Sequence, residues 1–422
     1  MAETMLNKTG KGVLVIFLCA LLVTLALSAC QKSASPTAST QKTYPTPLPC
    51  SGSAVPGLAD HLLIGFAGQD GTASAPGFDL RYQYLAGAVA SDVTCTPCSN
   101  CNTGSNWWGC WQEMTREPGL FVQRFITAAE QHGLLPMFTY YIILQASGVQ
   151  EGTPEVTAAA TNRDFMTRYF NDFRFFLQQV GAHRAIIHIE PDFWGYAQQA
   201  ARAASTDAHH LAAEVNTANA TDCGSQENSI AGMGSCMIAM VRAYAPNAYV
   251  GLHASSWGSG YDVILNTDPT LSIGSQGAST ADFLLSCGAA QSDVIVADIS
   301  DRDAGYYQSI GRNTWLDATD AKLPNFTQAF TWSHFVADRS GKPILWWQVP
   351  VGNMGLSNTT NAWTDNKVDY FFTHPDRVAA NGAIGMAFGS GATGQTSPET
   401  DNGNLVGWAA TLKEAGSQLL CP

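Results

Sequence analysis

The stretch RAIIHIEPDFWGY, residues 184–196, places two carboxyl groups directly after a run of apolar residues. Glu190 and Asp192 stand two positions apart, and Asp298 and Asp301 follow a second apolar run, DVIVA. A pair of carboxyls can cleave a glycosidic or similar bond when one donates a proton and the other, ionised, acts as base or nucleophile. The same acids can instead cap helices or pair with arginines. The elements around them must decide between these roles.

Eight short apolar runs recur along the chain and predict strands. Continuous runs rich in Ile, Val and aromatic residues are typical of strands buried on both faces of a parallel sheet. Segments with helical patterns lie between most of them, but the connection from Leu62 to Leu80 is too short for a full helix. The strands are expected at residues 61–68, 80–89, 135–143, 184–192, 248–258, 293–301, 342–350 and 382–391. Helices are expected at residues 117–133, 162–181, 228–244, 279–287, 328–337, 365–373 and 408–420.

Eight strands that alternate with helices predict a single (β/α)8 TIM barrel, of the α/β class, with a degenerate first repeat. An open doubly wound sheet is the alternative. However, neither G-x-G-x-x-G nor G-x-x-x-x-G-K-[ST] follows any expected strand, so nothing indicates a nucleotide site, and we expect no cofactor. In a TIM barrel the active site lies at the carboxyl ends of the strands.

Acids, amides and tryptophans collect at those ends. Period-two alternation along the fourth strand would put His188 inside the barrel and bring Glu190 to its mouth. We expect Glu190 to be the general acid and Asp298 its partner, with Asp301 as the substitute for Asp298 and Asp192 raising the pKa of Glu190. For the tryptophans, core packing and sugar stacking are both open. The expected substrate-binding residues are Trp194, His253, Trp257, Trp347, Gln348 and Asn353.

Other polar residues near the rim are expected to support the structure. Asp303 can cap the next helix or pair with Arg302, and His188 is expected to lie behind the reacting groups. No His-x-His or H-E-x-x-H pattern occurs, so we expect no metal site, although the carboxylates leave a metal-dependent hydrolase as a minor alternative.

The motifs HIEPDFWGY, HASSWG, SDRDAGYY, WQVPVGN and AFGSGATG resemble a largely uncharacterised family of exported bacterial proteins with a glycosidase-type barrel. The resemblance extends from His61 to Thr396 and implies a TIM barrel that acts on a glycan. The Glu-Pro-Asp triplet is also similar to one in glycoside hydrolase family six. Many retaining barrel glycosidases carry Glu at the ends of both strands four and seven, whereas strand seven here offers Gln348.

The composition narrows the expected ligand. A net charge of −13 disfavours nucleic acid, whose binding depends on Lys and Arg. Eleven tryptophans and only 13% charged residues suit a neutral, hydroxyl-rich oligo- or polysaccharide. We therefore expect a monomeric glycoside hydrolase, and the main alternative is a lipoprotein that binds glycan without cleaving it.

The first 30 residues are typical of a secretory signal. Lys8 and Lys11 precede a 15-residue apolar run, and LSAC, ending at Cys30, resembles a bacterial lipobox. Residues 31–49 are rich in Ser, Thr and Pro and are expected to be a tether. The sequence thus predicts a signal over residues 1–30, lipidation of Cys30, an extracytoplasmic location on the bacterial membrane, and a barrel domain over residues 50–422.

The remaining cysteines are expected to form disulfides, because an exported chain meets an oxidising compartment. We expect Cys50 to pair with Cys421, and Cys223 with Cys236, while Cys287 stays free. Four more cysteines fall within sixteen residues and are expected to form two local disulfides, with a zinc knuckle as the alternative: Cys95, Cys98, Cys101 and Cys110.

Overall fold

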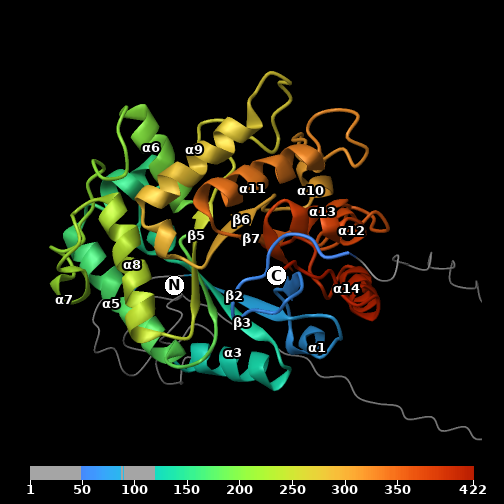
Figure 1. Cartoon of the computed structure of the whole chain (residues 1–422), viewed down its shortest axis with the longest axis horizontal. Helices are drawn as coiled ribbons and strands as arrows, with labels where there is room; N and C mark the ends of the chain where they lie inside the picture. The colour runs from blue at the N-terminus through green and yellow to red at the C-terminus, as the bar shows by residue number, and fades with distance from the viewer. Residues whose placement is uncertain (1–48, 87–88, 90–118) are drawn as a thin grey trace, which may run out of the picture. The chain divides into compact units, whose positions relative to one another are not determined.

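The computed structural model describes residues 49–86, 89 and 119–422. Within them, eight parallel strands close into a barrel in chain order, β1 to β8, so the TIM-barrel prediction is confirmed (Figure 1). The strands are β1 (Leu63–Phe66), β2 (Leu80–Ala86), β3 (Leu135–Tyr141), β4 (Ile186–Ile189), β5 (Tyr249–Ala254), β6 (Val294–Asp298), β7 (Ile344–Val349) and β8 (Ala383–Phe388).

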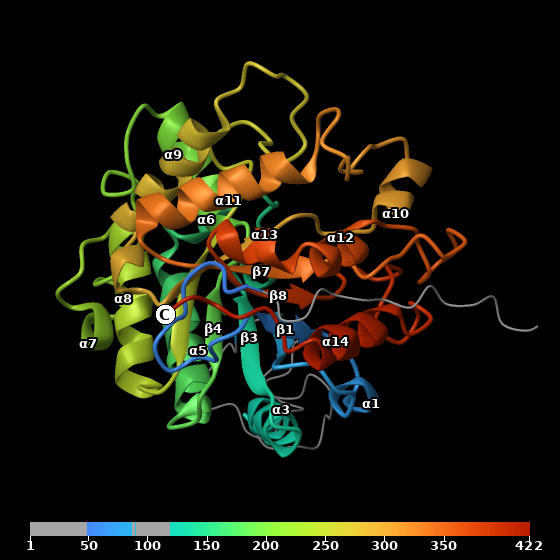
Figure 2. The same cartoon turned by 45° about the vertical axis from the view of Figure 1, so that its right-hand side comes forward.

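Helices surround these strands (Figures 1 and 2). The connection after β1 holds only the four-residue α1, so the first repeat is degenerate, as predicted. The longer helices are α3 (Leu120–Gln131), α5 (Arg163–Val180), α6 (Phe193–Ala203), α8 (Ile230–Tyr244), α9 (Ile273–Ser286), α11 (Phe326–Ser340) and α14 (Asn404–Glu414). The shorter ones are α1 (Asp70–Ala73), α4 (Ile143–Ser147), α7 (Ala220–Cys223), α10 (Ala304–Ser309), α12 (Lys367–Thr373) and α13 (Pro375–Ala380), with a π turn at Glu155–Ala159 and a 3-10 turn at Ala289–Gln291.

Side chains of β3 alternate between the helix layer and the barrel interior. The rings of Phe138 and Tyr140 lie 5.3 Å and 5.7 Å from that of Phe176 on α5. Thr139, between them, points inward and meets His188 of β4 at 3.1 Å. Both faces of the strand are therefore buried, which explains why the strands are continuous apolar runs.

Both ends of α5 lie where the sequence predicts, whereas α14 (Asn404–Glu414) begins and ends earlier than the expected range of 408–420. Asn162 caps α5 by accepting a hydrogen bond from the amide of Phe165 at 3.1 Å, and Gly181 follows the last residue of that helix. Such caps fix the point at which each connection leaves its helix, and hence the position of the next strand.

Two disulfides join the described cysteines in the predicted pairs. Cys50 is bonded to Cys421, with 5.1 Å between their Cα atoms, and Cys223 is bonded to Cys236. Cys287 is free and buried. The cluster at residues 95–110, the signal, Cys30 and most of the tether lie outside the described residues. In the part that is described, no helix has the length and apolarity needed to cross a membrane.

Candidate active site

A cavity of about 570 Å³ opens at the carboxyl ends of the strands, where TIM barrels place their active sites. Its wall is rich in carboxyl groups and aromatic rings. The lining includes Tyr84, Tyr141, Glu151, Asp192, Tyr196, Trp257, Asp298, Asp301, Arg302, Tyr307, Arg312, Trp347 and Gln348. Of the four carboxyls that the sequence singles out, three line this cavity and one does not.

Asp192 enters the cavity from a strained turn after β4. Both Glu190 and Asp192 have positive φ angles, 47° and 66°, on either side of Pro191. Burial raises the pKa of Asp192 to about 7, and the negative charges of Asp298 and Glu151 add to this effect against the opposing influence of His253. A carboxyl with such a pKa is still about half protonated at pH 7, and a general acid must carry its proton at the working pH.

Glu190 does not reach the cavity, and its expected position at the mouth is wrong. Its side chain is fully buried and accepts hydrogen bonds from the amides of Ile142 (3.1 Å) and Ile143 (3.2 Å) at the start of α4. The positive φ of Glu190 breaks the alternation of β4, so its side chain turns outward toward α4 and α5 rather than inward as that of His188 does. Burial raises its pKa to about 8, but the group lies behind the cavity wall rather than on it.

Asp298, the last residue of β6, lines the cavity as predicted. One oxygen lies 3.2 Å from Nε2 of His253 on β5. His253 was expected to bind substrate hydroxyls; it is instead 1% exposed and lies beneath Asp298, outside the cavity lining.

Asp301 also lines the cavity but carries a partner of its own. Arg302 lies 2.7 Å from one of its oxygens, and the hydroxyl of Tyr307 donates to the other. Arg312 faces the same wall and places its guanidinium 4.4 Å above the ring of Tyr307. The positive charge of Arg302 therefore offsets Asp301, so Asp298 is the better candidate for an acting carboxylate.

Aromatic rings form the rest of the wall. Trp257 packs on Tyr196 with 4.5 Å between ring centroids, and Trp347 lies deeper, 5.3 Å from Tyr84. Gln348, at a positive φ of 57°, accepts a hydrogen bond from the hydroxyl of Tyr84. Flat apolar faces beside hydrogen-bonding groups suit the alternating faces and hydroxyls of a sugar.

Two residues expected to bind substrate lie elsewhere. Trp194 is 1% exposed, and its indole nitrogen donates to the carbonyl of Ile189 at 2.9 Å, so it belongs to the core. Asn353 donates to the carbonyl of Asp401 and accepts from the amide of Gly355, so it shapes a loop. The geometry therefore leaves Trp257, Trp347 and Gln348 from the expected set.

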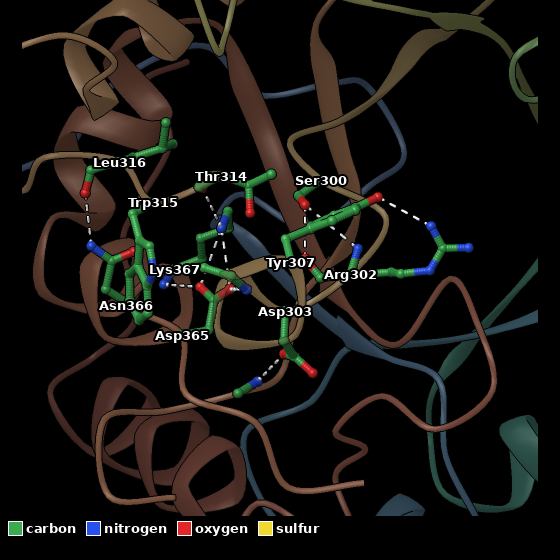
Figure 3. Close-up of polar contacts among 12 residues, drawn as sticks. Ser300, Arg302, Asp303, Tyr307, Thr314, Trp315, Leu316, Asp365, Asn366 and Lys367 are labelled. Atoms are coloured by element: carbon green, nitrogen blue, oxygen red, sulfur yellow. Dashed lines mark hydrogen bonds and ion pairs between the residues drawn. The ribbon is translucent and has the colours of Figure 1, made fainter. Parts of the chain in front are cut away.

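Asp303 ties together the loops that form the rim. Its two oxygens accept hydrogen bonds from the amides of Gly352 (2.9 Å) and Thr396 (2.8 Å), which belong to the loops after β7 and β8. Next to it, Asp365 and Lys367 form a fully buried ion pair of 3.2 Å (Figure 3). These contacts account for the acid-rich segment after β6 without assigning Asp303 a catalytic role.

Several residues of the cavity wall were not expected from the sequence. Tyr84 and Tyr141 stand near the carboxyl ends of β2 and β3, so the strand-end rule could have found them. Glu151 and Arg312 come from loops, where no periodic pattern marks them. Among the described residues, no three His, Cys, Asp or Glu side chains come together as metal ligands.

No protein-family model matches the chain, and no curated protein matches it. Solved structures similar to it include a GH5 xyloglucan-specific β-1,4-glucanase from a ruminal metagenomic library, at 10% identity and a TM-score of 0.47 over 84% of this chain and 89% of that one. A modular endo-β-1,4-mannanase from Cellulomonas fimi, of glycoside hydrolase family 26, is 11% identical, with a TM-score of 0.46 over 83% of this chain and 70% of that one. The endoglucanase Cel6 from Mycobacterium tuberculosis is 13% identical, with a TM-score of 0.29 over 54% of this chain, and the match spans 56% of the length of that endoglucanase. At these identities and TM-scores the likeness concerns the fold alone.

Proposed function

We propose that this chain is a glycoside hydrolase in which Asp192 is the general acid and Asp298 is the base or nucleophile. One observation carries the proposal: a carboxyl with a raised pKa and a second carboxyl line the same aromatic-walled cavity at the carboxyl end of the barrel. Glycoside hydrolysis needs this pair, because the leaving oxygen must be protonated while the sugar carbon is attacked.

The substrate class follows from the wall. Trp257, which is only partly buried, offers a face on which a sugar ring can stack, and Gln348 offers an amide for hydroxyl groups. Trp347, 3% exposed, closes the inner end of the cavity. A neutral oligo- or polysaccharide fits these groups, in line with the low proportion of charged residues in the sequence. Asp301 is the substitute for Asp298, at a disadvantage because Arg302 is bound to it.

The test is release of reducing sugar from a panel of glycans, followed by variants. On the glycan that is cleaved, Asp192→Asn and Asp298→Asn should each lower kcat by about 10²-fold or more, the usual value of acid–base catalysis. Asp301→Asn should have a smaller effect, and melting temperatures should stay near that of the wild type. The anomer released first, followed by NMR, tells whether Asp298 acts as nucleophile or as base.

Other outcomes would favour the alternatives. Tight glycan binding with no cleavage would make this a binding protein, and full activity in both Asn variants would remove the proposed pair. Loss of activity on dialysis against a chelator, restored by a divalent metal, would point to a metal-dependent hydrolase.

We also propose that the protein works outside the cytoplasm, held on the bacterial membrane by a lipid on Cys30. The support is the LSAC ending after an apolar run of 15 residues, which is short of the ~20 needed to span a bilayer. The intact mass of protein extracted from membranes tests this. A mature chain that starts at another residue, or that lacks the acyl mass, would contradict it.

A further inference from the structure

A chain of buried polar side chains runs from Asp298 into the interior of the barrel. Nε2 of His253 lies 3.2 Å from Asp298, Nδ1 of His253 lies 3.1 Å from Nε2 of His188, and Nδ1 of His188 lies 3.1 Å from the hydroxyl of Thr139. His253 is 1% exposed, and His188 and Thr139 are not exposed at all. The proposed acid and its partner leave the two imidazoles and the hydroxyl without a role.

The donor of each hydrogen bond in this series can be assigned by starting from Asp298. An ionised Asp298 can only accept, so His253 must carry its proton on Nε2. Nδ1 of a neutral His253 is then an acceptor, so His188 must donate from its own Nε2. Nδ1 of His188 accepts in turn, and the hydroxyl of Thr139 donates to it. Every nitrogen is satisfied in this arrangement, and burial holds the pKa of His188 well below its usual range, which keeps that ring neutral.

Packing against Trp347 holds the two hydrogen-bonded imidazoles in place. The ring of Trp347 meets the rings of His188 and His253 edge-on, at centroid distances of 4.7 Å and 5.8 Å. The charged and titratable groups that share the cavity wall with Asp298 include Tyr84, Glu151, Asp192, Asp301, Arg302, Tyr307 and Arg312, and Asp262 in the loop after β5 acts on it from outside that lining. Of the two cations, Arg302 is bound to Asp301 and Arg312 lies over the ring of Tyr307, whereas His253 lies within hydrogen-bonding distance of Asp298.

We propose that His253 and His188, backed by Thr139, are positioning residues that hold the carboxylate of Asp298 aimed into the cavity. This inference rests on the proposed function, in which the carboxylate of Asp298 acts as base or nucleophile. It adds that the interior of the barrel, and not only its rim, contributes to the reaction. A buried imidazole that donates to a carboxylate fixes both its direction and its charge state at little entropic cost.

Kinetics of His253 variants test the proposal. His253→Phe removes the donor, and kcat should fall about 10- to 100-fold while KM stays within a few-fold, as for the loss of a hydrogen bond to a charged group. The acid limb of the pH–rate profile should move to higher pH, because the ionised carboxylate loses a stabilising donor. His253→Gln, whose amide can still donate, should recover much of both effects.

Two controls separate this role from simple packing. His183→Gln replaces an exposed histidine that pairs with Glu130 at the amino end of β4, and it should leave the rate and the profile unchanged. A His253→Phe enzyme that keeps the wild-type rate and acid limb, or a Gln variant as impaired as Phe, would overturn the proposal.

The hydrogen-bond directions can be measured without any substrate. In protein with 15N-labelled histidine, NMR should show His188 and His253 as neutral tautomers with the proton on Nε2 at pH 7. A proton on Nδ1 of either ring would refute the chain as drawn. The tautomers bear on this inference alone, whereas Asp192→Asn and Asp298→Asn enzymes with full activity would refute the proposed function.

Discussion

Two neighbouring acids after β4 have opposite surroundings although only Pro191 separates them. Asp192 faces a cavity shared with other carboxyls, while Glu190 sits against two backbone amides of Ile142 and Ile143. The raised pKa of Asp192 serves proton donation only because the group also meets the cavity. The pKa of Glu190 is raised as well, which shows that a perturbed pKa by itself does not identify a catalytic acid.

The pH dependence of catalysis should report Asp192. Its pKa of about 7 means that it loses its proton as the pH rises through neutrality, so kcat/KM should fall tenfold per pH unit above that point. Profiles measured from pH 5 to 9 would show this basic limb. The profile of Asp192→Asn should lack this basic limb, and its kcat/KM should be low at every pH. A variant that keeps the limb would mean that another group supplies the proton.

Glu190→Gln should lower stability more than it lowers turnover. Above its pKa of about 8 the ionised carboxylate offers two accepting oxygens where the amide offers one, and the amide nitrogen would meet the amide of Ile142 or Ile143 as a second donor, so the two proteins are compared at a pH above 8. The free energy of unfolding should drop by about 1–3 kcal/mol, the cost of an unsatisfied buried polar group. Chemical denaturation and turnover per folded molecule are the measurements.

The matched control for Glu190→Gln is Glu130→Gln. Glu130 is half-exposed and pairs with His183, so the same chemical change should cost little there. If Glu190→Gln abolished turnover at wild-type stability, the catalytic role would return to Glu190.

At the scale of the elements, strand positions could be predicted and the direction of their last side chains could not. Apolar runs mark β4 and β7 because burial on both faces dictates residue type. Alternation, however, assumes extended backbone, and Glu190 and Gln348 adopt positive φ angles that no apolar pattern reveals. The prediction therefore found Asp298, which ends a regular strand, and misplaced Glu190, which follows one. Trp194 was misplaced for a related reason, since it belongs to α6 rather than to the rim.

The approach of α6 to the cavity depends on Gly195. A Cβ atom at this position would lie 2.6 Å from the hydroxyl of Ser255 and 2.7 Å from the ring of Trp257. Gly195→Ala should therefore displace Trp257 and raise KM several-fold, with a smaller change in kcat and a loss of about 1–3 kcal/mol of stability from overpacking. Steady-state kinetics and denaturation would measure both.

Gly407→Ala, in α14, is the control for the helix itself, because a Cβ there meets nothing within 4 Å. It should leave KM unchanged and add up to about 1 kcal/mol of helix propensity. An unchanged KM in Gly195→Ala would show that Trp257 does not contact the substrate.

At the scale of the whole barrel, the two ends of the strands have separate tasks. The cavity occupies the carboxyl ends, whereas the segments that precede β1 and follow α14 meet at the amino ends. The amide of Leu62 donates to the carbonyl of Gln418 at 2.8 Å, and that of Ala54 donates to the carbonyl of Cys421 at 2.9 Å. Closure of the barrel and chemistry at its mouth can therefore be changed independently.

The disulfide between Cys50 and Cys421 allows a test of this separation. It joins residues 371 positions apart, so its removal frees nearly the whole domain in the unfolded state. Cys50→Ser/Cys421→Ser should lower the free energy of unfolding by about 2–4 kcal/mol, while kcat and KM stay at wild-type values because the bond lies at the far end from Asp192 and Asp298.

The double variant Cys223→Ser/Cys236→Ser gives the comparison, since that bond joins α7 to α8 across a sequence separation of only 13 residues. In the chain-entropy account the longer loop contributes more, so this second variant should lose less stability. Thermal melts, activity assays and non-reducing peptide maps would be collected together. A peptide map that finds Cys50 unpaired would contradict the disulfide between Cys50 and Cys421. A Cys50→Ser/Cys421→Ser protein with impaired kcat would show that the two ends of the barrel are coupled after all.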